Sequence, residues 1–180
     1  MNRQPVIIVD YDPNWPNVFE AEKAYILNVA GEFIIALEHI GSTSVPGLGA
    51  KPIIDILAGV RTLAEGRQTI APLTAQLGYE YMPEYEVEMP YRLYFHKHPP
   101  VGDQFHLHMV ETTSEFWERH LLFRNYLRVH PEAAQEYDRL KRRLAEEYRT
   151  QREAYTDAKT EFVRAIEVKA RAESEVDIRP

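Results

Sequence analysis

The stretch that decides the fold runs from Ala36 to Val60 and reads ALEHIGSTSVPGLGAKPIIDILAGV. Its apolar ends are typical of two buried strands, and its glycine- and serine-rich middle predicts a tight turn between them. Gly41, Gly47 and Gly49 permit close approach of the backbone to a ligand, and amides bracketed by hydroxyls can hold an anion. Asp55 lies inside the second apolar run, where an unpaired carboxylate would be costly. It therefore requires a partner, which could be a metal ion, a basic side chain or several N–H groups.

Composition narrows the class of protein. The chain of 180 residues is 44% hydrophobic, which predicts one globular domain with a real core. It contains no cysteine, so disulfides, thiolate metal sites and cysteine nucleophiles are excluded. The net charge of −7 argues against a broad nucleic-acid surface. The apolar run near the start is too short for a signal peptide or a membrane span, so we expect a cytoplasmic protein that does not enter a membrane.

Outside the central stretch, turn residues and apolar periodicity predict alternating helices and strands. A proline-rich turn at residues 12–16 opens a helix that Gly31 ends. The remaining expectations for this half are a short strand over 6–10, a strand over 33–40, a helix over 62–77, and a strand or irregular flap over 79–87. The last third is expected to be helical, over 113–128, 131–152 and 156–170. We expect a single domain over 1–171 and a disordered tail over 172–180.

Two alternating stretches on either side of a Pro-Pro-Val-Gly-Asp loop predict a β-hairpin. With the loop centred near Val101, His96 faces His106 and Tyr94 faces His108. Arg92 and these four side chains would then share one polar side of the sheet. By contrast, the segment from His96 to Pro100 has the composition of an exposed loop edge, so His98 is expected to have no role in a site.

His106 and His108 lie two residues apart, which places both imidazoles on one face of a strand, roughly 6–7 Å apart at the backbone. Two histidines with a carboxylate can bind one metal ion, and Asp55 is the first candidate for the third ligand. Asp55, His106 and His108 are therefore the predicted metal ligands and catalytic residues. The alternative is two partly exposed histidines on a polar sheet face.

The residues predicted to hold an anion surround the glycine-serine turn. Its amides and hydroxyls could bind phosphate oxygens, with Lys51 adjacent in sequence and a lysine and an arginine reaching in from the helices. The predicted phosphate-binding residues are Gly41, Ser42, Thr43, Ser44, Lys51, Arg124 and Lys159. The basic run Arg139 to Arg143 is instead predicted to lie on a solvated helix face, with Arg142–Glu146 and Arg143–Glu147 paired along the helix.

Several segments together resemble one known family. They are residues 39–48, 50–52 and 54–56, then 123–128, 130–131 and 155–159. These segments resemble the signature of the GrpB family, which in turn resembles the nucleotidyltransferase superfamily of DNA polymerase beta. That superfamily carries Gly-Ser followed, after a short gap, by two metal-binding acids that flank a single residue. Gly41-Ser42 and Asp55 match this pattern, whereas Leu57 stands in the place of the second acid.

The resemblance implies an α/β (α+β) fold, with a nucleotidyltransferase-like mixed β-sheet flanked by helices and a helical C-terminal third. It also implies that a nucleotide or another phosphorylated small molecule binds with a divalent metal ion, Mg²⁺ or Mn²⁺ for oxygen ligands and Zn²⁺ or Ni²⁺ if the histidines ligate. Two alternatives stay open: a binding module with a degenerate active site, which Leu57 favours, and a hydrolase with a mononuclear His-His-Asp site. The sequence is compatible with a homodimer.

Overall fold

The computed structural model describes residues 5–177, with the side chains of 5–174, and it confirms a mixed α+β fold. One five-stranded sheet has the order β1-β2-β5-β4-β3. The strands are β1 (Ala36–Ile40), β2 (Ile53–Val60), β3 (Glu80–Tyr81), β4 (Leu93–Lys97) and β5 (Gln104–Glu111). The helices are α1 (Trp15–Ala30), α2 (Leu63–Gly66), α3 (Ile70–Leu77), α4 (Glu115–Val129), α5 (Pro131–Glu147), α6 (Arg152–Asp157) and α7 (Thr160–Asp177).

Strand β2 is the centre of the sheet, and it runs antiparallel to β1 and parallel to β5. Every residue of β2 is buried except Asp55, which is half-buried. A strand covered on both faces is expected to be a continuous apolar run, and residues 53–60 fit this expectation except at Asp55. The single acid of this run therefore stands out as a polar group placed in the middle of the molecule.

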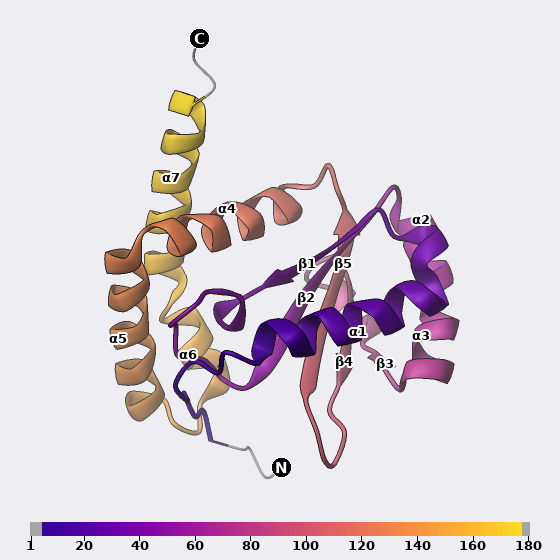
Figure 1. The fold of residues 1–180 in the computed structure, drawn as a ribbon, viewed down its shortest axis with the longest axis horizontal. Helices are drawn as coiled ribbons and strands as arrows, with labels where there is room; N and C mark the ends of the chain where they lie inside the picture. The colour runs from indigo at the N-terminus through magenta and orange to yellow at the C-terminus, as the bar shows by residue number, and fades with distance from the viewer. Residues whose placement is uncertain (1–4, 178–180) are drawn as a thin grey trace.

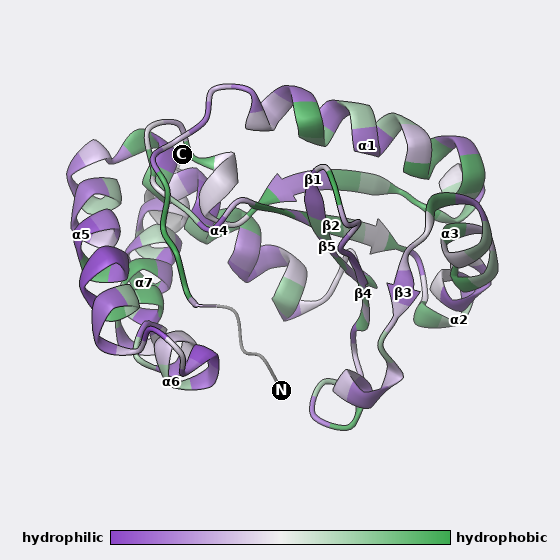
Figure 2. Ribbon diagram, turned by 90° about the horizontal axis from the view of Figure 1, so that it is seen from below, coloured by the Kyte–Doolittle hydropathy of each residue, from purple (hydrophilic) through white to green (hydrophobic). Residues whose placement is uncertain are grey.

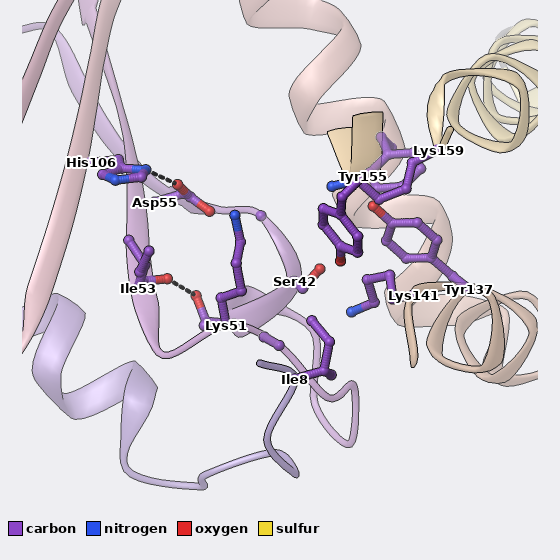
Figure 3. A pocket seen from close by; sticks show the side chains of 14 residues that line it. Ile8, Ser42, Lys51, Ile53, Asp55, His106, Tyr137, Lys141, Tyr155 and Lys159 are labelled. Atoms are coloured by element: carbon purple, nitrogen blue, oxygen red, sulfur yellow. Dashed lines mark hydrogen bonds and ion pairs between the residues drawn. The ribbon is translucent and has the colours of Figure 1, made fainter. Parts of the chain in front are cut away.

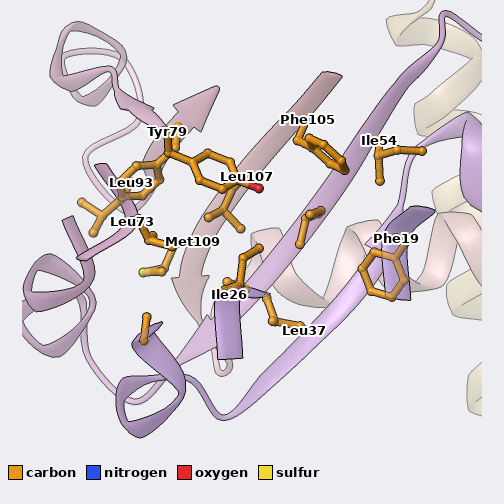
Figure 4. Close-up of a cluster of buried hydrophobic side chains, with 14 of the residues drawn as sticks. Phe19, Ile26, Leu37, Ile54, Leu73, Tyr79, Leu93, Phe105, Leu107 and Met109 are labelled. Atoms are coloured by element: carbon orange, nitrogen blue, oxygen red, sulfur yellow. The ribbon is translucent and has the colours of Figure 1, made fainter. Parts of the chain in front are cut away.

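One face of the sheet is apolar, and the other carries the polar side chains of β2, β4 and β5. Figures 1 and 2 show α1 lying along one side of the sheet. Helices α1, α2 and α3 cover the apolar face, where side chains such as Ile26, Leu73 and Leu107 form the main core (Figure 4). On the other face α4 covers only one end, through Phe116, Trp117 and Leu121 packed on Leu57 and its neighbours. The rest of that face carries Asp55, the predicted histidines and Tyr94, and it looks toward the C-terminal helices.

The hairpin register is confirmed. His96 pairs with His106 and Tyr94 pairs with His108, as the alternation predicted. Strand β5 is in turn aligned with β2 so that Asp55 is opposite His106 and Leu57 is opposite His108. Because side chains alternate along strands, all these residues face the same side of the sheet.

The C-terminal helices dock on the loop that leads from the turn into β2. Val45 and Leu48 of this loop pack in a cluster with Leu127, Tyr137 and Ile166. Asp138 of α5 accepts a hydrogen bond from the Gly49 amide at 3.0 Å. Figure 1 shows α5, α6 and α7 standing together beside the sheet rather than on it. The pocket described below lies between these two parts.

Some local expectations are corrected. The predicted strand over 6–10 reduces to a bridge between Val9 and Ala50, because its neighbours contact helices instead of the sheet. The flap over 79–87 is a two-residue strand followed by a 3-10 turn over Pro83–Glu86. The helix over 62–77 is divided by a 3-10 turn, and the last helix is divided into α6 and α7. Helix α7 continues to Asp177, so residues 172–177 are helical, and 178–180 lie outside the described residues.

Within the described residues, no helix is both long enough and apolar enough to cross a membrane.

Candidate functional site: a lysine-lined pocket beside the glycine-serine turn

The turn after β1 is built tightly around Asp55. Gly41 has a φ of +70°, and the next three residues form a 3-10 turn, Ser42–Ser44. A Cβ atom on Gly41 would lie 2.3 Å from Oδ2 of Asp55, so only glycine permits this approach. The Ser44 amide and hydroxyl both donate to the Gly41 carbonyl. Among the described residues the amides of Ser42 and Thr43 have no such acceptor, which leaves two donors at the start of the turn.

Two of the three hydroxyls in the turn have structural roles. The Thr43 hydroxyl lies 2.9 Å from Nε2 of His39 and donates to the Ile53 carbonyl. His39 itself stacks on Phe19 in the core, and burial lowers its pKa to about 4, so it is neutral. The Ser44 hydroxyl is occupied within the turn. Only the Ser42 hydroxyl faces the pocket, beside Tyr137 (Figure 3).

Asp55 finds its partner in His106. Oδ1 of Asp55 lies 3.3 Å from Nδ1 of His106, and the two residues are direct neighbours across β2 and β5. Burial alone would raise the pKa of Asp55, but the hydrogen bond and charge of His106, with His108 and Lys51, outweigh burial and lower that pKa. The acid is therefore ionised at neutral pH, and it orients the imidazole.

His108 does not join this pair. Its Nδ1 lies 3.1 Å from a guanidinium nitrogen of Arg92, and its ring lies beside the rings of Tyr94 and Phe116. Burial lowers the pKa of His108 to about 3, so it is neutral. Among the described side chains, no three His, Asp or Glu groups converge closely enough to hold one ion. The trio Asp55, His106 and His108 thus shares a sheet face, but only its first two members are in contact.

His98 replaces His108 as the second neighbour of His106. The two Nε2 atoms lie 3.2 Å apart, and His98 stacks on His96 with ring centroids 4.8 Å apart. The exposure predicted for His98 is confirmed, and its ring also contacts His96 and His106. His98 has the same parity as His96 of β4, so it lies on the same side of the hairpin and diagonally opposite His106.

Three lysines line the pocket, which has a volume of about 190 Å³: Lys51 lies beside Asp55, whereas Lys141 and Lys159 lie on the helical wall that faces it (Figure 3). Lys51 precedes β2, Lys141 comes from α5, and Lys159 comes from the turn between α6 and α7. Tyr155 lies between two of them, with the ammonium groups of Lys51 and Lys159 at 5.8 and 4.4 Å from its ring centroid. Within the described part of the chain, none of the three ammonium groups forms an ion pair with a carboxylate.

Burial destabilises the charge on each of these lysines. It lowers the pKa of Lys141 to about 7 and that of Lys159 to about 8, and it also lowers the pKa of Lys51. Lys141 is 2% exposed, and it donates to the Gly49 carbonyl. Three lysines whose positive charge is destabilised by burial therefore surround the Ser42 and Thr43 amides. Such an environment favours the binding of an anion.

The structure brings together five of the seven predicted phosphate-binding residues: Gly41, Ser42, Thr43, Lys51 and Lys159. Ser44 lies behind the turn. Arg124 is buried beneath it, where it donates to Glu38 at 2.6 Å and to the His39 carbonyl at 3.0 Å. Arg124 therefore supports β1 from outside the pocket.

Sequence reasoning missed Lys141, Tyr137 and Tyr155. The solvated face predicted for residues 139–143 is wrong for Lys141, and Arg142 pairs with Asp138 and Asp10 instead of Glu146. The signal was present in the helical spacing. Lys141 lies four residues after Tyr137 and three before Leu144, on the buried stripe of α5.

A second, wider hollow of about 760 Å³ adjoins the first, and Lys51 lines both. Its walls carry Tyr85, Tyr94, His108 and Arg152. A ligand anchored in the narrow pocket could extend past Lys51 into this hollow, where aromatic rings and a second basic group are available.

Comparison with known proteins places the chain among bacterial relatives. The family described as GrpB protein matches residues 5–169. The glutamate-rich protein GrpB of Alkalihalophilus pseudofirmus is 33% identical over 169 residues, which cover 92% of this chain and 96% of that protein. The UPF0157 protein YqkA of Bacillus subtilis is 39% identical over 171 residues, and the match spans 94% of this chain but about half (48%) of YqkA.

A solved structure shares the fold. The crystal structure of the conserved protein GrpB from Enterococcus faecalis superposes with a TM-score of 0.80 at 35% identity, covering 93% of this chain and 99% of that one.

Proposed function

The chain belongs to the GrpB protein family, and from this premise we propose that it binds a nucleotide or another phosphorylated small molecule in the lysine-lined pocket. The phosphate groups would lie against the Ser42 and Thr43 amides, with Lys51 on the sheet side and Lys141 and Lys159 on the helical side. The remainder of the ligand would extend past Lys51 toward Tyr94 and Arg152.

The observation that carries the proposal is the gathering of one buried lysine, Lys141, and two half-buried ones, Lys51 and Lys159, with no ion pair to a carboxylate among the described residues. A buried cation is costly unless an anion accompanies it, and a fold does not gain stability from three such lysines in one pocket. Among the described residues that line the pocket, Asp55 is the only acid, and it is already paired with His106. A phosphate group supplies several negatively charged oxygens, and its charge-assisted hydrogen bonds to lysine are among the strong ones.

The pocket can hold a divalent metal ion, but it lacks the second acid that nucleotidyl transfer requires. Mg²⁺ is commonly held by one or two carboxylates together with the phosphates of its ligand, so Asp55 fits a divalent ion shared with a bound phosphate. A polymerase-type site needs a second acid, but Leu57 is fully buried against Phe116 and Trp117, and Glu38 beside it pairs with Arg124. We therefore propose a binding site related to the nucleotidyltransferase pattern but without its two-acid centre.

A mononuclear His-His-Asp hydrolase receives less support from the geometry. Such a site needs His108 beside Asp55, and the His108 ring instead contacts Arg92, Tyr94 and Phe116.

Removing one pocket lysine is expected to weaken anion binding. In calorimetric titrations with pyrophosphate and with ATP, Lys159→Met should bind about 10- to 100-fold more weakly than the unaltered protein, because a hydrogen bond to a charged group contributes about 1.5–3 kcal/mol. Lys169→Met is the matched control, since it removes an exposed lysine of α7 and should bind normally. Equal affinity of both variants would refute the proposed pocket.

Anion binding should also depend on pH in a direction set by the lysines. Burial lowers the pKa of Lys159 to about 8 and that of Lys141 to about 7, so both lose charge as the pH rises through this range. A bound anion favours the charged forms, so we expect proton uptake on binding at pH 8 and falling affinity from pH 7.5 to 9. Calorimetry in buffers of different ionisation enthalpy measures this uptake. Binding without proton uptake, and with constant affinity over this range, would contradict it.

A further inference from the structure

We propose that His98 and His106 form a binding site for a transition-metal ion that prefers imidazole ligands, such as Zn²⁺ or Ni²⁺. The site lies at the loop end of the β4–β5 hairpin, next to the lysine-lined pocket. It is independent of phosphate binding, and it differs from the Asp55–His106–His108 trio predicted from the sequence.

The separation of the two ring nitrogens carries the inference. Nε2 of His98 and Nε2 of His106 lie 3.2 Å apart. Two imidazoles that bind one tetrahedral zinc ion, each about 2.0–2.1 Å from it, have their nitrogens about 3.3 Å apart. A single ion therefore fits between the rings with little movement of either residue.

Asp55 prepares His106 for this role. Metal-binding histidines commonly donate the other ring N–H to a carboxylate, which fixes the tautomer and leaves the free nitrogen directed at the ion. Here Oδ1 of Asp55 faces Nδ1 of His106 at 3.3 Å, so the lone pair of Nε2 points toward His98. Asp55 would act as a positioning residue in the second coordination shell.

The flanking residues hold His98 in place. His98 stacks on His96, whose Nε2 is 2.7 Å from a carboxylate oxygen of Glu80. This bond ties His96 to the edge strand β3, and the His98 ring lies against it. No third His, Asp or Glu among the described side chains completes the set, so the other coordination positions would be open to water or to a ligand atom. Such open positions are typical of metal sites that contact a substrate.

The test is a titration of tag-free, metal-free protein with Zn²⁺, Ni²⁺ and Co²⁺, in the absence of phosphate. We expect one ion per chain by calorimetry, together with a visible Co²⁺ absorption band that reports coordination by nitrogen. His98→Ala and His106→Ala should each remove both signals. Asp55→Asn should weaken binding about 10- to 100-fold, as is typical for a residue in the second coordination shell. His130→Ala, which removes a histidine between α4 and α5, should bind normally.

Other outcomes would overturn the proposal. If the unaltered protein binds none of the three ions, the two rings share only a hydrogen bond. If His108→Ala removes binding and His98→Ala does not, the ion lies between Asp55, His106 and His108. Circular dichroism on each variant shows whether it is folded, and His98→Ala keeps the test informative, since His98 is exposed and its loss leaves the core intact. Pyrophosphate binding without metal is measured separately, so failure of this site does not affect the proposed pocket.

Discussion

Replacing Lys141 by methionine is expected to weaken anion binding strongly and at the same time to make the ligand-free protein more stable. Lys141 is almost fully buried, and burial lowers the pKa of its ammonium from 10.5 to about 7. The unfolded chain accepts this proton more readily, so the charge opposes folding in the absence of an anion. Methionine has a similar length and no charge. The anion loses one of its three lysines, and we expect about a 100-fold loss of affinity.

The stability gain should be about 0.5–2 kcal/mol, offset in part by the lost hydrogen bond to the Gly49 carbonyl. The size of the gain should depend on pH. The unfolded state binds more protons than the folded state between pH 7 and pH 10.5, so the unaltered protein gains stability as the pH rises through this window. The stability of Lys141→Met does not rise with pH in this way. The free energies of unfolding of the two proteins should therefore become equal near pH 10.5.

Thermal unfolding of both proteins from pH 7 to 10, with Lys169→Met as the exposed control, measures this difference. A destabilised Lys141→Met variant that still binds pyrophosphate would show that Lys141 is a structural lysine, and it would remove one wall of the proposed pocket.

Substituting Gly41 by alanine should cause the largest loss of stability of the changes considered. The residue has a φ of +70°, and an added Cβ would lie 2.3 Å from Oδ2 and 3.0 Å from Cβ of Asp55. Backbone strain and overpacking together should lower the free energy of unfolding by about 2–5 kcal/mol. Asp55 would also move away from His106, so binding of phosphate and of metal should both fall. Urea denaturation measures the stability effect.

Gly47→Ala is a matched control for this prediction. Gly47 has a similar φ of +79°, but a Cβ there would meet nothing within 4 Å. Alanine at position 47 would therefore adopt a strained backbone conformation without a clash. We expect it to lower the free energy of unfolding by about 1 kcal/mol. If the two substitutions cost the same, the close approach of the turn to Asp55 is not what requires glycine. A Gly41→Ala, Asp55→Ala double variant should recover part of the stability, because it removes the atom that clashes.

The sheet face could be predicted from sequence because strand alternation is local information. The period-two pattern around residues 99–103 fixed both the hairpin and its register, and it placed His96 opposite His106 and Tyr94 opposite His108. The apolar run of β2 identified Asp55 as the one polar exception. Both inferences require only the parity of neighbouring residues, which no distant contact can change without shifting the whole strand.

Three residues of the helical wall, Tyr137, Lys141 and Tyr155, were not predicted, because their place in the pocket depends on how distant segments dock. The basic run around Lys141 has the composition of a solvated helix, and its burial depends on α5 packing against Gly49, about half the chain away. The contact of His98 with His106 follows instead from the hairpin register, since His98 continues the alternation of His96, although the composition of residues 96–100 indicates a loop edge. The helical spacing of Lys141 with Tyr137 and Leu144 indicates a buried side chain, whereas the composition of residues 139–143 indicates a solvated face.

The two walls of the pocket also have a consequence for the order in which the protein is made. In the described part of the chain every strand of the sheet precedes Thr112, whereas Tyr137, Lys141, Tyr155 and Lys159 all follow it. A ribosome therefore releases the turn and Asp55 well before the residues that enclose them, and the pocket is completed only when the last helices arrive. A ligand that needs both walls cannot bind the partly made chain. Once bound, it should act mainly by slowing the detachment of α5 and α6, which proteolysis of these helices with and without pyrophosphate would detect.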